Sequence, residues 1–243
     1  MPNALEFSVV VPVKDEAGNA AALALEIAAA LEGRAYEVIF VDDASRDDTR
    51  LELAEVKARV PALRVIGHRR NCGQSRAVRT GVLAARAPIV GTLDGDGQND
   101  PADLPRLLAR LTRPDASPKL GMVIGKRTKR RDSWAKRMGS TIANAVRKRL
   151  LRDGADDSGS GVKVFAREAF LRLPYFDHMH RYMPALMMRE GYAVEFLEVN
   201  HRPRGAGRSK YTNLGRLAAT ATDLFGVMWL LSRARDPKGA DEL

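Results

Sequence analysis

The sequence IVGTLDGDGQNDP, residues 89–101, decides the fold and locates its functional site. Apolar and small residues run directly into two aspartates that stand one residue apart, Asp94 and Asp96. The apolar run predicts a buried strand over 89–96 that ends in a polar loop. Pro101 fits the first position of a helix, because its missing N–H would be unpaired there in any case. The stretch therefore predicts a strand, a carboxylate-rich loop and a helix in succession.

Strand and helix patterns alternate on both sides of this stretch. Short, mostly apolar runs predict strands over 7–13, 36–43, 63–68, 89–96 and 122–126. Helical patterns occupy 19–32, 47–59, 74–86 and 101–113. Such runs suit parallel strands covered on both faces, and their alternation with helices predicts a doubly wound open sheet. Ligands of such sheets bind beyond the carboxyl ends of the strands, so the polar clusters at 12–16, 42–45 and 94–96 should face one crevice.

The second half of the chain differs in character. Residues 126–152 are strongly basic and predict a loop followed by a helix, and 153–161 is a further loop. Strands are predicted at 162–166 and 193–200, with a helix near 180–190 between them, a Gly- and Arg-rich loop over 201–211 and a final helix over about 213–233. We divide the chain into a domain over 1–211 and a C-terminal amphipathic helix within 212–243. Trp229, Arg233 and Arg235 suit contact with a membrane surface, and a homodimer contact or ordinary packing on the sheet are the alternatives.

Composition limits the classes of protein that need to be considered. The chain has 243 residues, of which 45% are hydrophobic, enough for a sizeable core. A single cysteine, Cys72, excludes a disulfide framework and a zinc site made of cysteines. We expect neither a signal peptide nor a membrane-spanning helix, because long apolar runs are missing from the sequence. The net charge of +10 indicates either an anionic partner or a generally basic chain.

The paired aspartates have two interpretations. Gly95 frees the backbone, so Asp94 and Asp96 can both turn toward one site, where carboxylate oxygens would suit a hard cation such as Mg²⁺ or Mn²⁺. The alternative is a capped turn, since Asp, Gly and Asn are common turn residues. Other phosphate-binding schemes fail: G-x-G-x-x-G does not follow the first strand, and GMVIGKR at 121–127 departs from a P-loop.

Several segments together carry a resemblance to a known family. VVVPVKDE, VDDASRDDT, LDGDGQNDPADLPRL, GKR and RGAGRSKY occur in this order. They resemble the inverting GT-A glycosyltransferases of family 2, and within them the synthases of dolichyl- and polyprenyl-phosphate sugars such as dolichol-phosphate mannosyltransferase. The resemblance implies a GT-A nucleotide-sugar-binding (Rossmann-like) α/β fold, a mixed sheet flanked by helices with a C-terminal helical extension. It also implies a Mg²⁺ or Mn²⁺ cofactor.

The resemblance assigns roles to individual positions. Asp94, Asp96 and Arg204 would be catalytic, and Asp96 and Gln98 would hold the metal. The donor nucleotide sugar, of the GDP-mannose or UDP-hexose type, would contact Pro12, Lys14, Glu16, Asp43, Asp94, Gly95, Asp96, Arg127, Arg204 and Lys210. Positive charge from Arg and Lys would stabilise the diphosphate as the glycosidic bond breaks.

The acceptor implied by the resemblance is a polyprenyl phosphate. A phosphate monoester already carries an anionic oxygen, so it needs positive charge rather than a general base. The candidates are Arg137, Arg181 and Ser209, and the basic run adds Arg130 and Arg131. The protein would then act at the cytoplasmic face of the inner membrane as a peripheral protein.

Three other functions remain open at this point. Transfer to another lipid or glycan hydroxyl would need a general base, for which Asp156 and Asp157 are candidates. A basic nucleic-acid-binding protein would use the charge of +10. Aromatic residues are only 6% of the chain, however, and known binding motifs are missing from the sequence. We therefore expect no nucleic acid partner. A catalytically silent relative would be a scaffold, against which the intact D-x-D-x-Q and R-x-x-G-x-S-K motifs argue.

Overall fold

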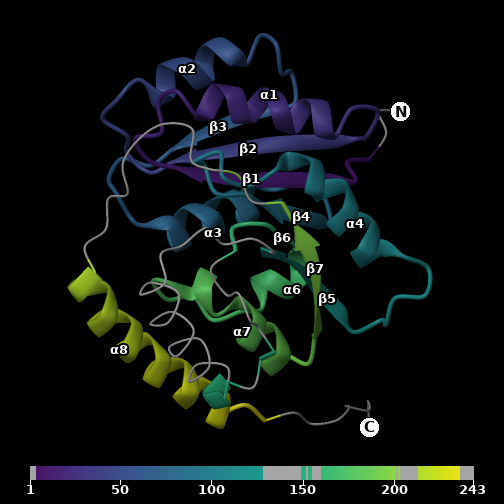
Figure 1. Ribbon diagram of the computed structural model, residues 1–243, viewed down its shortest axis with the longest axis vertical. Coiled ribbons are helices and arrows are strands. Elements are labelled where there is room, and N and C mark those ends of the chain that lie inside the picture. The colour runs from purple at the N-terminus through teal and green to yellow at the C-terminus, as the bar shows by residue number, and fades with distance from the viewer. Residues whose placement is uncertain are drawn as a thin grey trace, which may run out of the picture.

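The computed structural model describes residues 4–127, 149–151, 153–154, 160–200, 202 and 213–235, the backbone alone over 213–220. The described residues form a central sheet with helices on both faces (Figure 1). The strands are β1 (Phe7–Val13), β2 (Tyr36–Asp42), β3 (Leu63–Gly67), β4 (Ile89–Thr92), β5 (Leu120–Arg127), β6 (Lys163–Ala166) and β7 (Ala193–Val199). The order across the seven-stranded sheet is β3-β2-β1-β4-β6-β5-β7.

The sheet is mixed, as the family resemblance implies. Strands β1 to β4 run parallel to one another, whereas β6 lies antiparallel to both β4 and β5, and β7 is parallel to β5. The carboxyl ends of β1, β2 and β4 therefore meet at one edge of the sheet, where the functional site was predicted.

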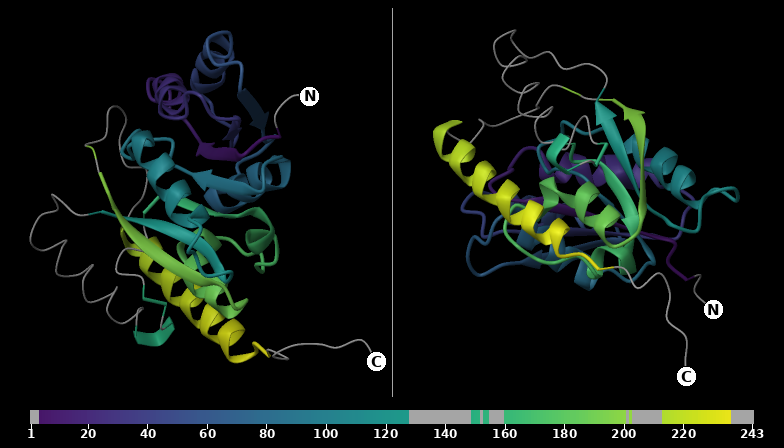
Figure 2. Two further views of the ribbon diagram at one scale, coloured as in Figure 1. Left: turned by 90° about the vertical axis from the view of Figure 1, so that its right-hand side faces the viewer. Right: turned by 90° about the horizontal axis from the view of Figure 1, so that it is seen from below.

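Two helical layers cover the sheet (Figure 2). One layer contains α1 (Ala20–Ala30), α2 (Thr49–Val56) and α4 (Leu104–Thr112), which follows the short 3₁₀ helix η1 (Pro101–Asp103). The other contains α3 (Gln74–Ala84), α6 (Arg167–Leu171), the 3₁₀ helix η2 (Met179–Arg181), α7 (Met183–Arg189) and α8 (Asn213–Ser232). Each layer packs its apolar side chains into its own core cluster on one face of the sheet.

The strand and helix periods of the sequence produce these two cores. In β1, Val9 and Val11 enter the core under α1 and α4, while Val10 between them enters the core under α3. Successive side chains of a strand point to opposite faces, so a strand covered on both sides is apolar at every position. Helix α4 buries Leu104 and Leu111 with the leucines between them at helical spacing, forming one apolar stripe.

The structure corrects several predicted boundaries. The predicted strand 89–96 ends at Thr92, so Asp94 and Asp96 lie in the loop beyond β4. Helix α6 was not predicted, because five residues are too short to show a helical period. The predicted helix near 180–190 begins with η2 and continues as α7.

Helix α8 confirms the predicted C-terminal helix and packs against α7, with Val227 buried in the core that α3 and α7 share. Among the described residues, we find no helix with the length and apolar character needed to cross a bilayer.

Candidate active site

The D-x-D-x-Q segment forms a tight loop directly after β4. The Asp96 carboxylate accepts a hydrogen bond from the backbone N–H of Gln98 at 3.2 Å. Asn99 Oδ1 accepts one from the backbone N–H of Asp94 at 3.1 Å. Asp100 then caps η1 by accepting from the Ala102 amide at 3.0 Å. These side chains hydrogen-bond the nearby backbone, which is what Asp and Asn do in turns. The structure therefore shows the predicted turn, and the role of its carboxylates as a metal site stays a prediction.

Two glycines allow other segments to pack closely on this loop. A Cβ atom at Gly95 would lie 2.5 Å from Val13 Cγ1 and 2.9 Å from the carbonyl oxygen of Pro12. A Cβ atom at Gly161 would lie 2.3 Å from Asp94 Oδ2. Real Cβ contacts of this length essentially never occur, so both positions are closed to larger residues unless neighbours move. The end of β1 and the segment before β6 therefore hold the loop from two sides.

A small pocket opens beside Asp94. Its lining combines polar groups with an apolar wall and consists of Pro12, Gln74, Val78, Thr92, Leu93, Asp94, Gly161, Lys163, His180 and Met183. Gln74, at the start of α3, donates from Nε2 to Asp94 Oδ1 at 2.8 Å. Lys163 is buried at the start of β6, and its ammonium group donates to the carbonyl oxygen of Ser160. A carboxylate, an ammonium group and an amide thus converge on one enclosed space.

The pKa of Asp94 is raised mainly because its carboxyl group is buried. Burial raises the pKa of Asp94 and nearby Asp96 raises it further, against the lowering effects of Lys163, Arg127 and the Gln74 hydrogen bond. All candidate ligands in this loop offer oxygen atoms, which suits Mg²⁺ or Mn²⁺. A divalent cation would neutralise the two carboxylates that otherwise repel each other. The residues present therefore fit such a metal, with Asp96 and Gln98 as its predicted ligands.

His180 gives the pocket a neutral imidazole. Burial lowers the pKa of His180 well below 6.5, and the positive charges of Lys163 and Arg181 lower it further. The Ser75 hydroxyl lies 2.7 Å from His180 Nδ1, and its oxygen accepts from the His180 backbone amide at 3.3 Å. Ser75 therefore holds the His180 ring in place from the start of α3. Arg181, a predicted acceptor residue, is half-buried next to this histidine.

The loops after β1 and β2 are bound to each other. Lys14 Nζ donates to the Ala44 carbonyl oxygen at 3.3 Å and pairs with Asp15 at 3.1 Å. The Glu16 amide donates to Thr49 Oγ1 at 2.8 Å, and its carboxylate accepts from the Asn19 side chain at 3.0 Å. Lys14 and Glu16 thus lie at the expected edge of the sheet, where both also stabilise loop structure.

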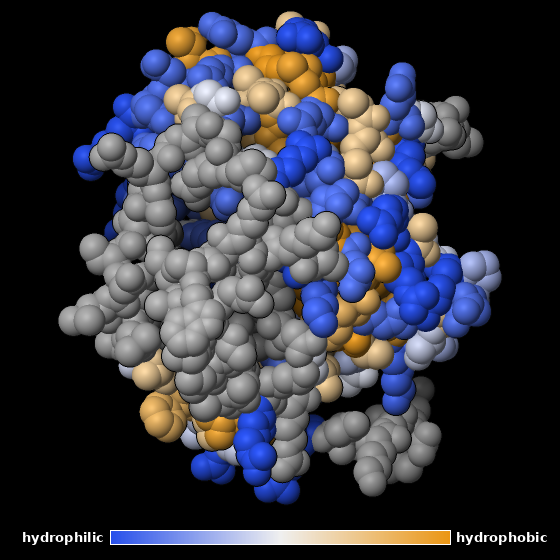
Figure 3. Space-filling model, in the orientation of Figure 1, coloured by the Kyte–Doolittle hydropathy of each residue, from blue (hydrophilic) through white to orange (hydrophobic). Residues whose placement is uncertain are grey.

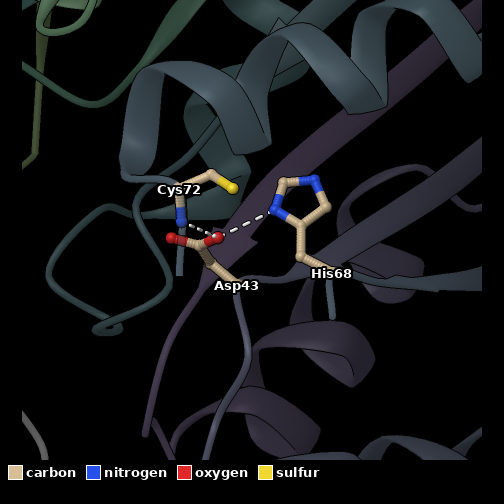
Figure 4. A group of neighbouring side chains, drawn as sticks. All are labelled: Asp43, His68 and Cys72. Atoms are coloured by element: carbon tan, nitrogen blue, oxygen red, sulfur yellow. Dashed lines mark hydrogen bonds and ion pairs between the residues drawn. The ribbon is translucent and has the colours of Figure 1, made fainter. Parts of the chain in front are cut away.

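Asp43, which follows β2, joins this strand to the start of α3 (Figure 4). Its carboxylate accepts from the Cys72 amide at 2.8 Å and the Gly73 amide at 2.7 Å, and it lies 2.8 Å from His68 Nδ1. The other ring nitrogen of His68 lies 2.9 Å from Thr80 Oγ1. Asp43, His68 and Cys72 are close enough to suggest a metal cluster, but three N–H groups already occupy the carboxylate. The geometry is that of a hydrogen-bonded support, and the predicted donor contact of Asp43 stays a prediction.

Arg202 attaches the chain after β7 to the D-x-D-x-Q loop. Its backbone amide donates to the Gln98 carbonyl oxygen at 2.9 Å, and its guanidinium pairs with Asp100 at 2.6 Å and Glu26 at 2.5 Å. Two residues earlier, the Asn200 amide donates to buried Asp103 at 2.8 Å. The segment that leads into the R-x-x-G-x-S-K motif therefore contacts the candidate metal loop directly.

The predicted site residues fall into three groups. Pro12, Asp94, Gly95, Asp96, Gln98 and Arg127 come together around the D-x-D-x-Q loop. Lys14, Glu16 and Asp43 lie in the loops after β1 and β2, and Arg181 follows the pocket residue His180. The candidates Arg130, Arg131, Arg137, Asp156, Asp157, Arg204, Ser209 and Lys210 lie outside the described residues.

Three pocket residues were not predicted from the sequence, namely Gln74, Lys163 and His180. A lysine inside the apolar run VKVFA was a usable signal for Lys163. For the other two, only the packing of α3 and η2 on the loop shows their role.

Comparisons with known proteins show the family of the chain. The model of the family described as "Glycosyl transferase family 2" matches residues 8–173. A dodecaprenyl-phosphate galacturonate synthase of Rhizobium johnstonii is 31% identical over 233 residues, covering 93% of this chain and 68% of the relative. An undecaprenyl-phosphate 4-deoxy-4-formamido-L-arabinose transferase of Pseudomonas paraeruginosa is 32% identical over 227 residues, covering 91% of this chain and 64% of the relative. The chain thus spans about two thirds of the length of these relatives.

A solved structure shares the fold. The crystal structure of glucosyl-3-phosphoglycerate synthase from Mycobacterium tuberculosis, in complex with Mg²⁺ and UDP, has a TM-score of 0.71 at 17% identity. The alignment covers 96% of this chain and 81% of that one. The fold is therefore that of the GT-A glycosyltransferases, a mixed α/β sheet flanked by helices with a further C-terminal helix. The chain belongs to glycosyl transferase family 2 and is a glycosyltransferase.

Proposed function

We propose that this glycosyltransferase moves a sugar from a nucleotide sugar to a polyprenyl phosphate, with inversion and with a divalent metal. The observation that carries the proposal is the D-x-D-x-Q loop, which lies beyond the carboxyl end of β4 against the end of β1 and whose Asp94 lines the pocket. Two relatives at 31% and 32% identity are named as enzymes of polyprenyl-phosphate sugars, which supports this acceptor class. The complex of the structural neighbour with Mg²⁺ and UDP supports a nucleotide donor and a metal.

The described residues supply the parts that such a transfer needs. A bound Mg²⁺ or Mn²⁺ would provide positive charge for the leaving diphosphate, held by Asp96 and Gln98. Gln74 orients the Asp94 carboxylate through its hydrogen bond of 2.8 Å, and Arg127 contributes positive charge from the end of β5. The pocket beside Asp94 also has an apolar wall, to which Val78, Leu93 and Met183 contribute.

The acceptor phosphate explains why a dedicated general base is unnecessary. Its oxygen is anionic at neutral pH and can attack the sugar without losing a proton first. The protein must instead bring two anions together, and Arg181 beside the pocket is a described cation suited to that task. Transfer to a hydroxyl acceptor is the alternative, and it would require a base.

Donor binding can be tested by thermal unfolding. We would measure the midpoint with GDP, UDP, GDP-mannose, UDP-glucose and UDP-galacturonate, each with and without Mn²⁺. A ligand that binds only the folded state raises the free energy of unfolding, by about 2.7 kcal/mol at a concentration of 100 times Kd, and the midpoint rises with it. We expect the midpoint to rise only for ligands that share one base, either guanine or uracil, and only when Mn²⁺ is present. The variant Asp96→Ala should lose this rise. A shift unaffected by metal and by this substitution would contradict the metal assignment.

The acceptor needs its own experiment. The enzyme would be given radiolabelled donor with undecaprenyl phosphate or with undecaprenol, which differ only in the phosphate. Labelled lipid formed from the phosphate alone supports the proposal. Equal transfer to the alcohol would favour a hydroxyl acceptor with a general base.

A further inference from the structure

Two arginines of α3 lie against one tyrosine ring. The guanidinium carbon of Arg76 is 3.8 Å from the centre of the Tyr175 ring, and that of Arg79 is 5.4 Å from the same centre. Arg76 and Arg79 stand three residues apart, so they share one side of the helix. Tyr175 belongs to the segment between α6 and η2 and is half-buried, as both arginines are. We name Arg76, Arg79 and Tyr175 the α3 arginine cluster.

No carboxylate of the described residues balances the positive charge of this cluster. Neither guanidinium forms an ion pair in the part of the chain that the structure describes. The acidic residue nearest to Tyr175 in the sequence is Asp177, which instead accepts a hydrogen bond from the backbone N–H of His178 at 2.9 Å. Other half-buried arginines do have carboxylate partners, the pairs being Arg64 with Glu37, Arg113 with Glu195 and Arg189 with Glu190.

Exposure alone would not make the α3 arginine cluster unusual. Figure 3 shows hydrophilic side chains over much of the described surface on one face of the molecule, as expected for a chain with a net charge of +10. An exposed arginine is solvated and needs no protein partner. Arg79 differs because its Nη1 atom is buried and has no hydrogen-bond partner. Among the described residues, Ser160 Oγ is the one other buried side-chain atom in this condition.

The buried Nη1 atom of Arg79 indicates what kind of ligand the cluster suits. A buried N–H group without a protein partner costs free energy unless a water molecule or an ion binds it. Water would satisfy the N–H group but would leave two like charges side by side, whereas an anion would satisfy the N–H group and the charges together. Arg76 also lies in the first turn of α3, where the helix dipole adds positive potential.

We propose that the α3 arginine cluster binds a phosphate monoester. Each guanidinium group presents its N–H donors in a planar fork that matches phosphate oxygens, and contact with the Tyr175 ring restrains the Arg76 fork. A phosphate monoester carries a charge of about −1.5 to −2 at neutral pH, which balances two guanidinium groups. A carboxylate or a phosphodiester carries a single negative charge and would leave one positive charge in place.

The α3 arginine cluster is separate from the pocket beside Asp94. Its three residues are not among those that line that pocket. The same helix nevertheless holds Gln74 against Asp94, so a monoester bound at the cluster would restrain a helix that also supports the pocket. The inference does not rest on the proposed function, because binding at the cluster requires neither donor nor metal.

Titration with methyl phosphate, followed by phosphorus NMR, provides the test. The full chain would be titrated in EDTA, which prevents phosphate from binding through a metal. Arg76→Gln/Arg79→Gln removes both guanidinium groups, and Arg59→Gln/Arg86→Gln is the matched control, because it removes two exposed arginines elsewhere. We expect the first variant to bind at least about tenfold more weakly than the parent, since one hydrogen bond to a charged group contributes about that factor. The control should keep the Kd of the parent.

A lysine variant separates hydrogen-bond geometry from charge. Arg76→Lys/Arg79→Lys keeps both charges but replaces each planar fork with a compact ammonium group. It should bind methyl phosphate more weakly than the parent and more tightly than the glutamine variant. Equal affinity for the parent and the lysine variant would contradict a site built on guanidinium forks. Thermal melting followed by circular dichroism would establish that every variant is folded.

Phosphate monoesters occur both in soluble compounds and in lipid headgroups, and competition distinguishes the two sources. The competitors are glycerol 3-phosphate and vesicles of phosphatidylcholine with or without phosphatidic acid. Displacement of methyl phosphate by glycerol 3-phosphate assigns a soluble ligand. Displacement only by the vesicles that contain phosphatidic acid assigns a lipid headgroup.

Four results would overturn the inference. The parent does not bind methyl phosphate, the glutamine variant binds it as tightly as the parent, the control loses as much affinity as the glutamine variant, or dimethyl phosphate binds as tightly as methyl phosphate. Thermal shifts with donor and Mn²⁺, measured on the same variants, report separately on the proposed function.

Discussion

Replacing Gly161 with alanine should disable the site while leaving the fold intact. The φ angle of Gly161 lies in the range open to alanine, so the added methyl acts through contact alone. It would lie 2.3 Å from Asp94 Oδ2 and 2.5 Å from Asn99 Oδ1, whereas ordinary contact begins at 3.4 Å. The Asp94 carboxylate or the 160–163 segment must therefore move by about 1 Å, a displacement that can cost about 100-fold in rate at an active site.

The stability effect should be smaller than the effect on activity. Overpacking costs about 1–3 kcal/mol, and alanine recovers about 0.4–1 kcal/mol by restricting the unfolded chain. We expect a net loss of about 1–2 kcal/mol, which for a chain of this size lowers Tm by about 2–8 °C. Steady-state transfer with a Mn²⁺ titration would measure kcat, KM and the metal requirement of the folded enzyme.

Gly226→Ala is the matched control for this substitution. A Cβ atom at Gly226 would have open space within 4 Å, so the change should preserve activity and raise stability slightly. If Gly161→Ala retained the transfer rate and metal requirement of the parent, the close contact with Asp94 would have no functional meaning.

Three further substitutions test other parts of the structure. Arg202→Ala should raise the Mn²⁺ concentration for half-maximal activity about tenfold, because it removes the ion pair with Asp100 and loosens the segment that contains Gln98. Glu26→Gln removes only the outer ion pair of Arg202 and should change this concentration little. Burial would raise the pKa of Glu37, but hydrogen bonds to its carboxylate outweigh this effect and lower the pKa. The stability that these bonds provide is therefore present above pH 4.5, the ordinary pKa, and is lost as the pH falls through the lowered pKa. Glu37→Gln should cost about 2 kcal/mol at neutral pH and flatten the acid limb of a Tm-against-pH curve, and an unchanged limb would refute this. Gly81→Ala should cost about 1–3 kcal/mol, since its Cβ would lie 2.3 Å from a β1 side chain, yet donor affinity of the folded protein should be unchanged in calorimetric titration.

The sequence was sufficient to predict the parallel half of the sheet and the D-x-D-x-Q loop. The apolar run over 7–13 and the strand–helix alternation depend on local periodicity, which a reader of the sequence can see. The early end of β4 at Thr92 was not predictable in this way, because the apolar run continues to Leu93 and offers no signal for the last paired residue. Strand length here is set by pairing with β6, a contact between distant segments.

The pocket residues show the same limit. Asp94 could be predicted because its motif is local, but Gln74 and His180 reach the pocket only through the packing of α3 and η2. Their sequence neighbourhoods, NCGQSRA and HMHRY, carry no motif that distinguishes them from surface residues. Position in space, rather than residue pattern, makes them part of the site.

The reversal of β6 explains why the site forms where it does. In a fully parallel sheet, the neighbour of β4 would also present its carboxyl end and a further outgoing loop. Because β6 is antiparallel, Thr92 at the end of β4 pairs with Lys163 at the beginning of β6. The incoming segment then brings Gly161 against Asp94, and Thr92 Oγ1 donates to the Gly161 carbonyl oxygen at 3.0 Å. One change in strand direction thus places the buried ammonium group of Lys163 and the backbone of Gly161 beside Asp94, where all three residues line the pocket.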